Sequence, residues 1–168
     1  MLHLNLAGVD RGEVSLREQV PPDHPLWDGS GVELAKPLDV DLTARSVGDG
    51  VLVRGTLRTT VRQACRRCLA PVEQEVDEHV DLLFTAHSDE DDGLDGEVYF
   101  LPARGDDLDL SDAVREQVLL QAPQFTLCRE DCRGLCPTCG TDLNEGACEC
   151  VPEAAPGAWD ALKNVKFD

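Results

Sequence analysis

Alternating apolar and polar side chains dominate the first half of the chain and predict a series of β-strands. Short strands are expected over 2–6 and 13–20. A longer one over 32–47 contains Pro37, which predicts an edge or a bulge there. The Gly-Asp-Gly stretch at 48–50 is typical of a hairpin turn and separates this strand from the next one. A meander of antiparallel strands is therefore the expected body of the fold.

The most regular alternation lies on either side of a Cys-x-x-Cys turn at 65–68. From 51 to 62, valine and leucine hold one face, and arginine and threonine hold the other. From 72 to 84, valine, leucine and phenylalanine alternate with acidic residues. Pairing the two strands about the turn brings their apolar faces together. The same pairing sets arginines opposite acids, so we expect cross-strand ion pairs rather than a free basic face for Arg54, Arg58 and Arg62.

A helical pattern follows the strands. Apolar residues at helical spacing predict a helix over Leu110–Gln121, with Asp109 or Ser111 as N-cap and Pro123 just after its end. A short strand is expected over 98–101. Trp27, alone in a proline-rich loop, is expected to cover the core as a lid.

The predicted fold class is α+β, an antiparallel β-meander body with one or two helices and an appended Cys-rich zinc-binding module. The tail contains apolar and lysine residues at the spacing of a short amphipathic helix over 158–167. The predicted organisation is a β-rich body with its C-terminal helix over 1–122, a zinc module over 123–151 and a tail over 152–168.

Eight cysteines fall into four local pairs, which is the strongest chemical signal in the chain. Two thiolates separated by two residues on a tight turn can both reach one metal ion at roughly 2.3 Å. We therefore predict two structural Zn²⁺ sites, one made by Cys136, Cys139, Cys148 and Cys150 and the other by Cys65, Cys68, Cys128 and Cys132. In the second set, Cys128 and Cys132 are expected to lie on one helical turn. The alternative is a single site drawn from the six downstream cysteines, with Cys65 and Cys68 free.

Metal binding is favoured over disulfides by the expected location of the protein. The first residues, MLHLNLAGVDRGE, do not have the pattern of an export signal, and no apolar run reaches the length of a membrane span. We therefore expect a cytoplasmic protein, where clustered thiols more often hold metal than each other. Zinc is preferred, with iron–sulfur chemistry or redox-active thiols as the alternatives.

The charge of the chain points to a basic partner. The formal net charge is -18, which repels nucleic acid at long range and attracts basic proteins. An acidic loop at Asp89, Glu90, Asp91 and Asp92 is a candidate site for holding such a protein, with a solvated loop as the plain alternative. Arg66 and Arg67 lie on the cysteine turn with no acid beside them, so we expect them to contact a partner or RNA phosphates.

The order of these features resembles the YceD family, named for accumulation of large-subunit ribosomal RNA. The matching elements are the Cys-Arg-Arg-Cys-Leu turn at 65–69, the acidic loop, the helix and the Cys-rich block, and the resemblance covers roughly residue 40 to the C-terminus. The turn shared across the family corresponds here to Cys65, Arg67 and Cys68. The resemblance implies a non-catalytic factor of ribosome biogenesis that binds the large-subunit precursor through a basic ribosomal protein or rRNA, without a membrane or a small-molecule substrate.

Two other functions fit parts of the sequence. A thiol oxidoreductase could use Cys65 and Cys68, because neighbouring arginines lower a thiol pKa. However, a turn between meander strands is not the βαβ context typical of that chemistry. A zinc-ribbon adaptor of a nucleic-acid machine would need a protein as its target, given the acidic charge. The sequence contains no Gly-rich phosphate loop and no nucleophile–base pair, so we do not expect an enzyme.

Overall fold

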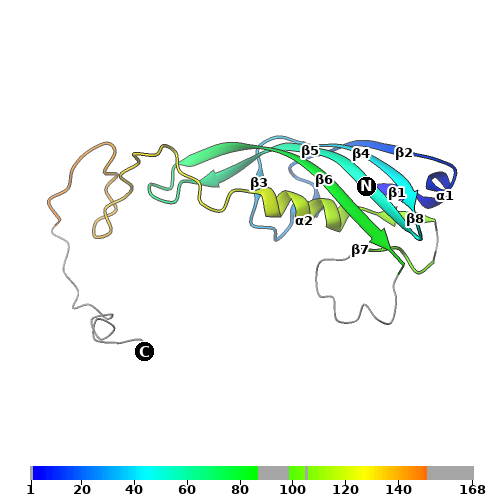
Figure 1. The fold of residues 1–168 in the computed structure, drawn as a ribbon. Coiled ribbons are helices and arrows are strands. Elements are labelled where there is room, and N and C mark those ends of the chain that lie inside the picture. Colours follow the sequence, from blue (N-terminus) through cyan, green and yellow to red (C-terminus); the bar gives the residue numbers. More distant parts are fainter. Residues whose placement is uncertain (1, 87–98, 105, 151–168) are drawn as a thin grey trace, which may run out of the picture.

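A computed structural model describes residues 2–86, 99–104 and 106–150 of the chain. Figure 1 shows a long curved sheet with one helix lying along a face of it and the Cys-rich segment beyond one end. In chain order the elements are β1 His3–Asn5, α1 Leu6–Val9, β2 Val14–Val20, the 3-10 turn η1 Pro25–Trp27, β3 Glu33–Leu34, β4 Leu38–Val47, β5 Gly50–Ala64, β6 Pro71–Thr85, β7 Tyr99–Phe100, β8 Asp107–Asp109 and α2 Ser111–Gln121.

The main sheet has the strand order β2-β4-β5-β6-β7, and its first four strands are antiparallel neighbours. This confirms the predicted antiparallel meander with helices and with cysteine clusters near the C-terminal end. The short strand β7 is also present, but it lies parallel to β6, with Tyr99 opposite Phe84. Strands β1 and β8 form a separate two-stranded sheet, and neither β8 nor the short helix α1 was expected from the sequence.

Pro37 divides the strand that the sequence predicts over 32–47. Strands β3 and β4 both lie along the same side of β5, with Leu34 opposite Val61 and Val40 opposite Leu57. Proline has no N–H to donate, so the ladder is interrupted where Pro37 stands. The hydroxyl of Thr59 donates instead to the Lys36 carbonyl at 2.9 Å. The single strand predicted over 32–47 is therefore two strands, and Pro37 lies at a break between them rather than at the predicted edge or bulge.

The hairpin of β5 and β6 carries the cross-strand charge pairs expected from the sequence. Each arginine on the outer face of β5 contacts the carboxylate directly opposite it on β6. The pairs are Arg54–Asp81 at 2.7 Å, Arg58–Asp77 at 3.0 Å and Arg62–Glu73 at 2.8 Å. Pairs of this kind contribute about 0.2–1 kcal/mol each. The outer face of the hairpin is therefore not a free basic surface.

The opposite face of the sheet buries the apolar side chains. Leu42, Leu57 and Val61 on the sheet and Val114 and Val118 on α2 are all fully buried in one core. Their positions alternate along the strands and recur at helical spacing on α2, as the sequence predicts. Trp27 covers the same core and is only 7% exposed, so its predicted role as a lid is confirmed.

Helix α2 begins one residue later than expected. Its N-cap position is Leu110, whose side chain makes no capping hydrogen bond. The cap comes from the preceding residue, because the Asp109 carboxylate accepts a hydrogen bond from the Ser111 N–H at 2.9 Å. The prediction of Asp109 or Ser111 as the N-cap residue is therefore wrong by position, although the carboxylate does satisfy the first free N–H of the helix.

Some expectations concern residues outside the described part of the chain. They are the acidic loop at Asp89, Glu90, Asp91 and Asp92, the first residue of the 98–101 strand and the amphipathic helix over 158–167. Among the described residues, none of the helices has the length and apolar character needed to cross a membrane.

Candidate metal centres

The cysteines form two groups, one where the tip of the β5–β6 hairpin meets the Cys-rich segment and one within that segment. Within each group all four sulfurs lie within 4.8 Å of one another. The first centre contains Cys65, Cys68, Cys128 and Cys132, and the second centre contains Cys136, Cys139, Cys148 and Cys150. These are the two sets that the pairwise spacing predicts. The alternative, with Cys65 and Cys68 separate from the downstream cysteines, is not what the structure has.

The sulfur geometry fits a tetrahedral cation. Two separations in the first centre are 3.8 Å, from Cys65 Sγ to Cys132 Sγ, and 3.6 Å, from Cys68 Sγ to Cys128 Sγ. A tetrahedron with Zn–S bonds of about 2.3 Å has sulfur–sulfur edges of about 3.8 Å. A disulfide would need about 2.0 Å, and all eight cysteines are free. Four thiolates at these distances suit Zn²⁺, and the identity of the ion stays a prediction.

The same turn starts both centres. In the second centre the Gly140 N–H donates to the Cys136 carbonyl at 2.9 Å, and Gly140 has a φ of 75°. In the first centre the Leu69 N–H donates to the Cys65 carbonyl at 3.0 Å, and Leu69 has a φ of 61°. Among the described residues Leu69 is the only one other than glycine with a positive φ. The first turn therefore accepts backbone strain that glycine avoids in the second.

Backbone N–H groups on these turns favour a thiolate at the first cysteine of each. The Arg67 N–H lies 3.4 Å from Cys65 Sγ. Hydrogen bonds led by the one from the Cys68 N–H lower the pKa of Cys65 to about 6. The N–H groups of Cys139 and Thr138 likewise lower the pKa of Cys136 to about 6. Each centre therefore holds one sulfur that is ready to bind a cation near neutral pH.

Crowding of the sulfurs acts in the opposite direction on their partners. The neighbouring Cys132 sulfur, followed by burial, raises the pKa of Cys128 to about 12. In the second centre the Cys139 sulfur has the same effect on Cys150, whose pKa is also raised to about 12. A divalent cation between the sulfurs would offset this repulsion. The donor set is therefore that of a cation site rather than of four independent thiols.

Cys128 and Cys132 reach the first centre without a helix. The chain between them bends in a single turn closed by the Cys132 N–H, which donates to the Arg129 carbonyl at 3.2 Å. The predicted helical turn is therefore wrong. The carbonyls of Glu130 and Cys132 instead accept hydrogen bonds from Arg67 at the hairpin tip.

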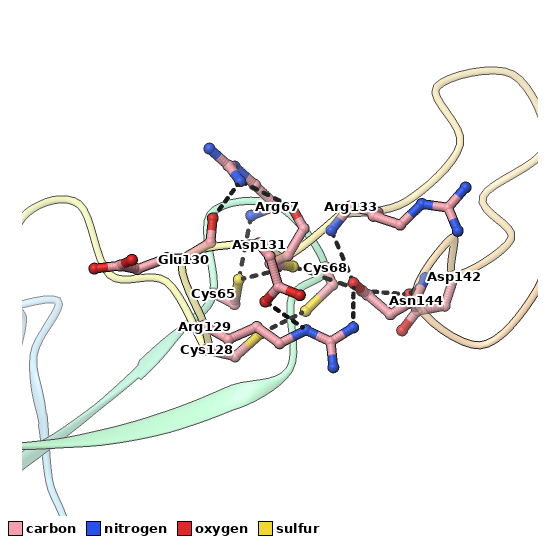
Figure 2. Close-up of polar contacts among 11 residues, drawn as sticks. Cys65, Arg67, Cys68, Cys128, Arg129, Glu130, Asp131, Arg133, Asp142 and Asn144 are labelled. Atoms are coloured by element: carbon pink, nitrogen blue, oxygen red, sulfur yellow. Dashed lines mark hydrogen bonds and ion pairs between the residues drawn. The ribbon is translucent and has the colours of Figure 1, made fainter.

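Arg67 fastens this segment to the hairpin tip. Its Nη1 donates to the carbonyl of Cys132 at 2.8 Å. It also donates to the carbonyl of Glu130 at 3.1 Å, as Figure 2 shows. Its own carbonyl accepts from the Leu135 N–H at 2.9 Å. The backbones come so close here that a Cβ on Gly134 would lie 2.7 Å from the Arg67 carbonyl oxygen. The middle of the Cys-Arg-Arg-Cys turn is therefore a structural clamp.

Asn144 connects the two centres. It lies in the loop between the cysteine pairs of the second centre, and its Nδ2 donates to Cys132 Sγ of the first centre at 3.5 Å. Its Oδ1 accepts from the Arg133 N–H at 2.8 Å and from Arg129 Nη2 at 2.9 Å. No contact between this residue and the first centre is predicted from the sequence. A short polar side chain between two cysteine pairs was the available signal.

Arg66 grips the segment on the other side of the first centre. Its Nε and Nη2 donate to the Gln124 carbonyl at 3.0 and 2.9 Å. Its guanidinium carbon lies 4.8 Å from the centroid of the Phe125 ring. Arg66 and Arg67 are both exposed, so a role in partner or RNA contact stays a prediction alongside their structural one. The sequence alone assigns no role to Phe125. The scarcity of aromatic residues, 4% of the chain, was the available signal.

Comparison with known proteins connects this arrangement to a family. The family model described as "Large ribosomal RNA subunit accumulation protein YceD" matches residues 53–166 of the chain. That range includes the hairpin tip and both cysteine centres. No solved structure matches the chain significantly.

Individual relatives agree with the family model. An uncharacterised protein of Mycobacterium tuberculosis is 37% identical over 106 residues, which is 63% of this chain and 51% of that protein. The Zea mays protein named large ribosomal RNA subunit accumulation protein YCED homolog 1, chloroplastic, is 28% identical over 169 residues, which is 82% of this chain and 56% of that protein. The chain spans about half the length of these curated relatives. It is therefore a member of the YceD family of large ribosomal RNA subunit accumulation proteins.

Proposed function

We propose that this chain is a non-enzymatic, cytoplasmic factor that supports accumulation of large-subunit rRNA by binding the precursor of the large ribosomal subunit. The contact is made through a basic ribosomal protein, the rRNA precursor or both. The maize relative carries this process in its name, and the same family model covers this chain. Zn²⁺ in both centres serves the fold rather than a reaction.

The closed cysteine centres are the observation that carries the non-enzymatic role. Each centre supplies four sulfurs to one point. Structural zinc sites use four protein ligands, whereas catalytic ones keep one position open for water or substrate. With four thiolates around it, a cation has no position left for a reacting group. What remains for the centres is to fix Arg66, Arg67 and the surrounding surface in place.

Charge suggests how an acidic chain handles two kinds of partner. The acidic residues at 89–92 would hold a basic ribosomal protein, while the exposed guanidinium groups at the hairpin tip would contact RNA at short range. Neutralising all four acids should weaken binding to a basic partner and flatten its salt dependence. Unchanged binding at every salt concentration would leave that loop as a solvated linker only.

Depletion of the protein in the cells that make it tests the function. We expect the ratio of large- to small-subunit rRNA to fall and the native protein to sediment with large-subunit precursors. Wild-type chain should restore the ratio. A Cys65→Ser, Cys68→Ser variant should not, because the first centre would lose two of its four sulfurs and with them its cation. An unchanged rRNA ratio after depletion would contradict the proposal.

A thiol redox role has one observation in its favour, the low pKa of Cys65. Against it, Cys65 is fully buried, so a substrate disulfide cannot reach its sulfur in the folded chain. Metal content and thiol titration of anaerobically purified protein separate the two roles. We expect two cations per chain and no thiol that reacts readily. One cation together with a reactive Cys65 would favour the redox role.

A further inference from the structure

The most exposed large apolar side chain among the described residues is Phe125, at 80%. Exposure of this size in a large aromatic ring has a cost, because the ring loses the free energy of burial. It is not explained by looseness of the chain, since both neighbouring residues are anchored to the hairpin tip. The fold therefore exposes an aromatic ring to solvent on a segment whose backbone is anchored.

A single residue, Arg66, makes most of this anchor. Its guanidinium donates twice to the Gln124 carbonyl, and its backbone N–H donates to the Thr126 carbonyl at 2.9 Å. Thr126 is itself buried, and its hydroxyl donates to Gln63 Oε1 at 2.6 Å. Phe125 lies between these two fixed residues. The backbone of Phe125 is therefore held in place before any partner binds.

The guanidinium of Arg66 also stacks on the ring. The Arg66 Cζ lies 4.8 Å from the Phe125 centroid, within the range of a cation–π contact. Since the ring is still 80% exposed, most of its surface remains open. An aromatic ring with one partner in place and its remaining surface free is a ready stacking surface for another flat group.

The surroundings of this ring are polar and locally cationic. A hollow beside it is lined by polar side chains, namely Glu33, Arg62, Gln63, Arg66, Gln124 and Thr126. Within the described ranges no carboxylate pairs with Arg66 or Arg67, and Figure 2 shows the Glu130 carboxylate turned away from the Arg67 guanidinium. An apolar peptide would meet few apolar partners in this hollow. A nucleotide offers a flat base for the ring and polar groups for the hollow.

We propose that Phe125 and Arg66 form a platform that stacks an unpaired base of RNA, with Arg67 contacting an adjacent phosphate. The proposal rests on the proposed function and deepens it, because it names single-stranded RNA as the partner of the hairpin tip. The net charge of -18 does not prevent such a contact. Salt screens charges beyond about 8 Å, and the nearest acid along β6, Glu73, is already paired with Arg62.

The test measures binding of the zinc-loaded full chain to a labelled single-stranded RNA and to a duplex of the same sequence. Phe125→Leu keeps an apolar side chain and removes the ring, so we expect about a tenfold loss of single-strand affinity. Phe125→Trp should retain that affinity. Arg66→Ala should weaken binding because the ring loses its stacked guanidinium and its anchor. Arg67→Ala should reduce the slope of log K against log salt by about 0.7 for the one phosphate that it contacts.

Two matched variants control for general effects. Arg45→Ala removes an exposed arginine near the opposite end of β5, and Leu120→Ala removes an exposed apolar side chain of α2. Both should leave RNA binding unchanged. Metal content and thermal unfolding of every variant show that the centres and the fold are retained. If Arg66→Ala fails to fold, Phe125→Leu, which breaks no hydrogen bond at the anchor, still decides the question.

Two results would overturn the platform. They are equal binding of single strand and duplex, and unchanged single-strand affinity in Phe125→Leu. If the second result comes with weaker binding of Phe125→Leu to a basic ribosomal protein, the ring is assigned to a protein contact instead. Each of these leaves the proposed function intact if depletion still lowers large-subunit rRNA. An unchanged rRNA ratio after depletion would refute the function itself.

Discussion

Asn144 donates a hydrogen bond from Nδ2 to Cys132 Sγ at 3.5 Å, and so a loop of the second centre touches a ligand of the first. The same amide accepts from the Arg133 backbone through its oxygen at 2.8 Å. Removing a group that orients a metal ligand typically lowers metal affinity by about 10–100-fold. Loading of one centre should therefore depend on the loop that belongs to the other.

Asn144→Ala should lower the cation affinity of the first centre by about tenfold or more, because Cys132 loses its donor and the loop loses its anchor. Competition with a chromophoric chelator measures the affinity. Glu145→Ala in the same turn is the matched control, since the described contacts of Glu145 use its backbone and not its side chain. Equal affinities for the two variants would show that the centres are independent.

Gly134→Ala should separate the Cys-rich segment from the hairpin tip. The new Cβ would lie 2.7 Å from the Arg67 carbonyl oxygen, on a backbone with a φ of 74°. We expect a loss of about 2 kcal/mol or more in stability, through combined overlap and backbone strain. Thermal unfolding of zinc-loaded protein measures it. Gly146→Ala, where a Cβ meets open space, should behave as wild type.

Leu69→Gly should stabilise the zinc-loaded chain. Leu69 has a φ of 61° and is 64% exposed, so its side chain contributes little burial and keeps the strain of the left-handed region. Glycine there should add about 1 kcal/mol, seen as a higher unfolding temperature. Leu69→Ala removes the same exposed side chain but keeps a Cβ, so it should show no such gain. A stabilised alanine variant would attribute the effect to the exposed leucine instead.

The number of protons released on zinc binding should change with pH. Cys65 and Cys136 have pKa values of about 6, below the ordinary thiol value of 9.0, so near pH 7.5 both are already ionised. Binding should then release about three protons or fewer per centre, rising to about four below pH 6. Because protons compete with the cation, affinity rises with pH. Calorimetry in buffers of different ionisation enthalpy counts them. Four protons per centre at pH 7.5 would contradict the low values.

Much of the body and both cysteine sets could be predicted from the sequence, because each depends on local spacing. Alternation along β5 and β6 sets their apolar and charged faces, and Pro37 predicts an irregularity, although not the full break, between β3 and β4. Pairs of cysteines separated by two residues also predict metal ligands from their local spacing alone. The family match covers the same region.

The features that escaped prediction depend on contacts between distant residues. The sequence places no acid beside Arg66 and Arg67, whereas their guanidinium groups contact backbone carbonyls about sixty residues away. The exposure of Phe125 could not be predicted, because it depends on the contacts of Arg66 with the residues on either side of the ring. Strand β8 pairs with β1 from the far end of the body, and three residues are too few for a pattern.

The four ligands of the first centre are synthesised in two steps that lie about sixty residues apart. Cys65 and Cys68 leave the ribosome before Cys128, and the sixty residues between them take about 3–12 s at about 5–20 residues per second. During that time the hairpin tip carries two cysteine sulfurs, only half of a coordination shell. The shell closes only after β6 and α2 have been made and the segment after α2 returns to the tip. A bound cation in this centre is therefore a sign that the chain has been synthesised past Cys132 and has folded back on itself.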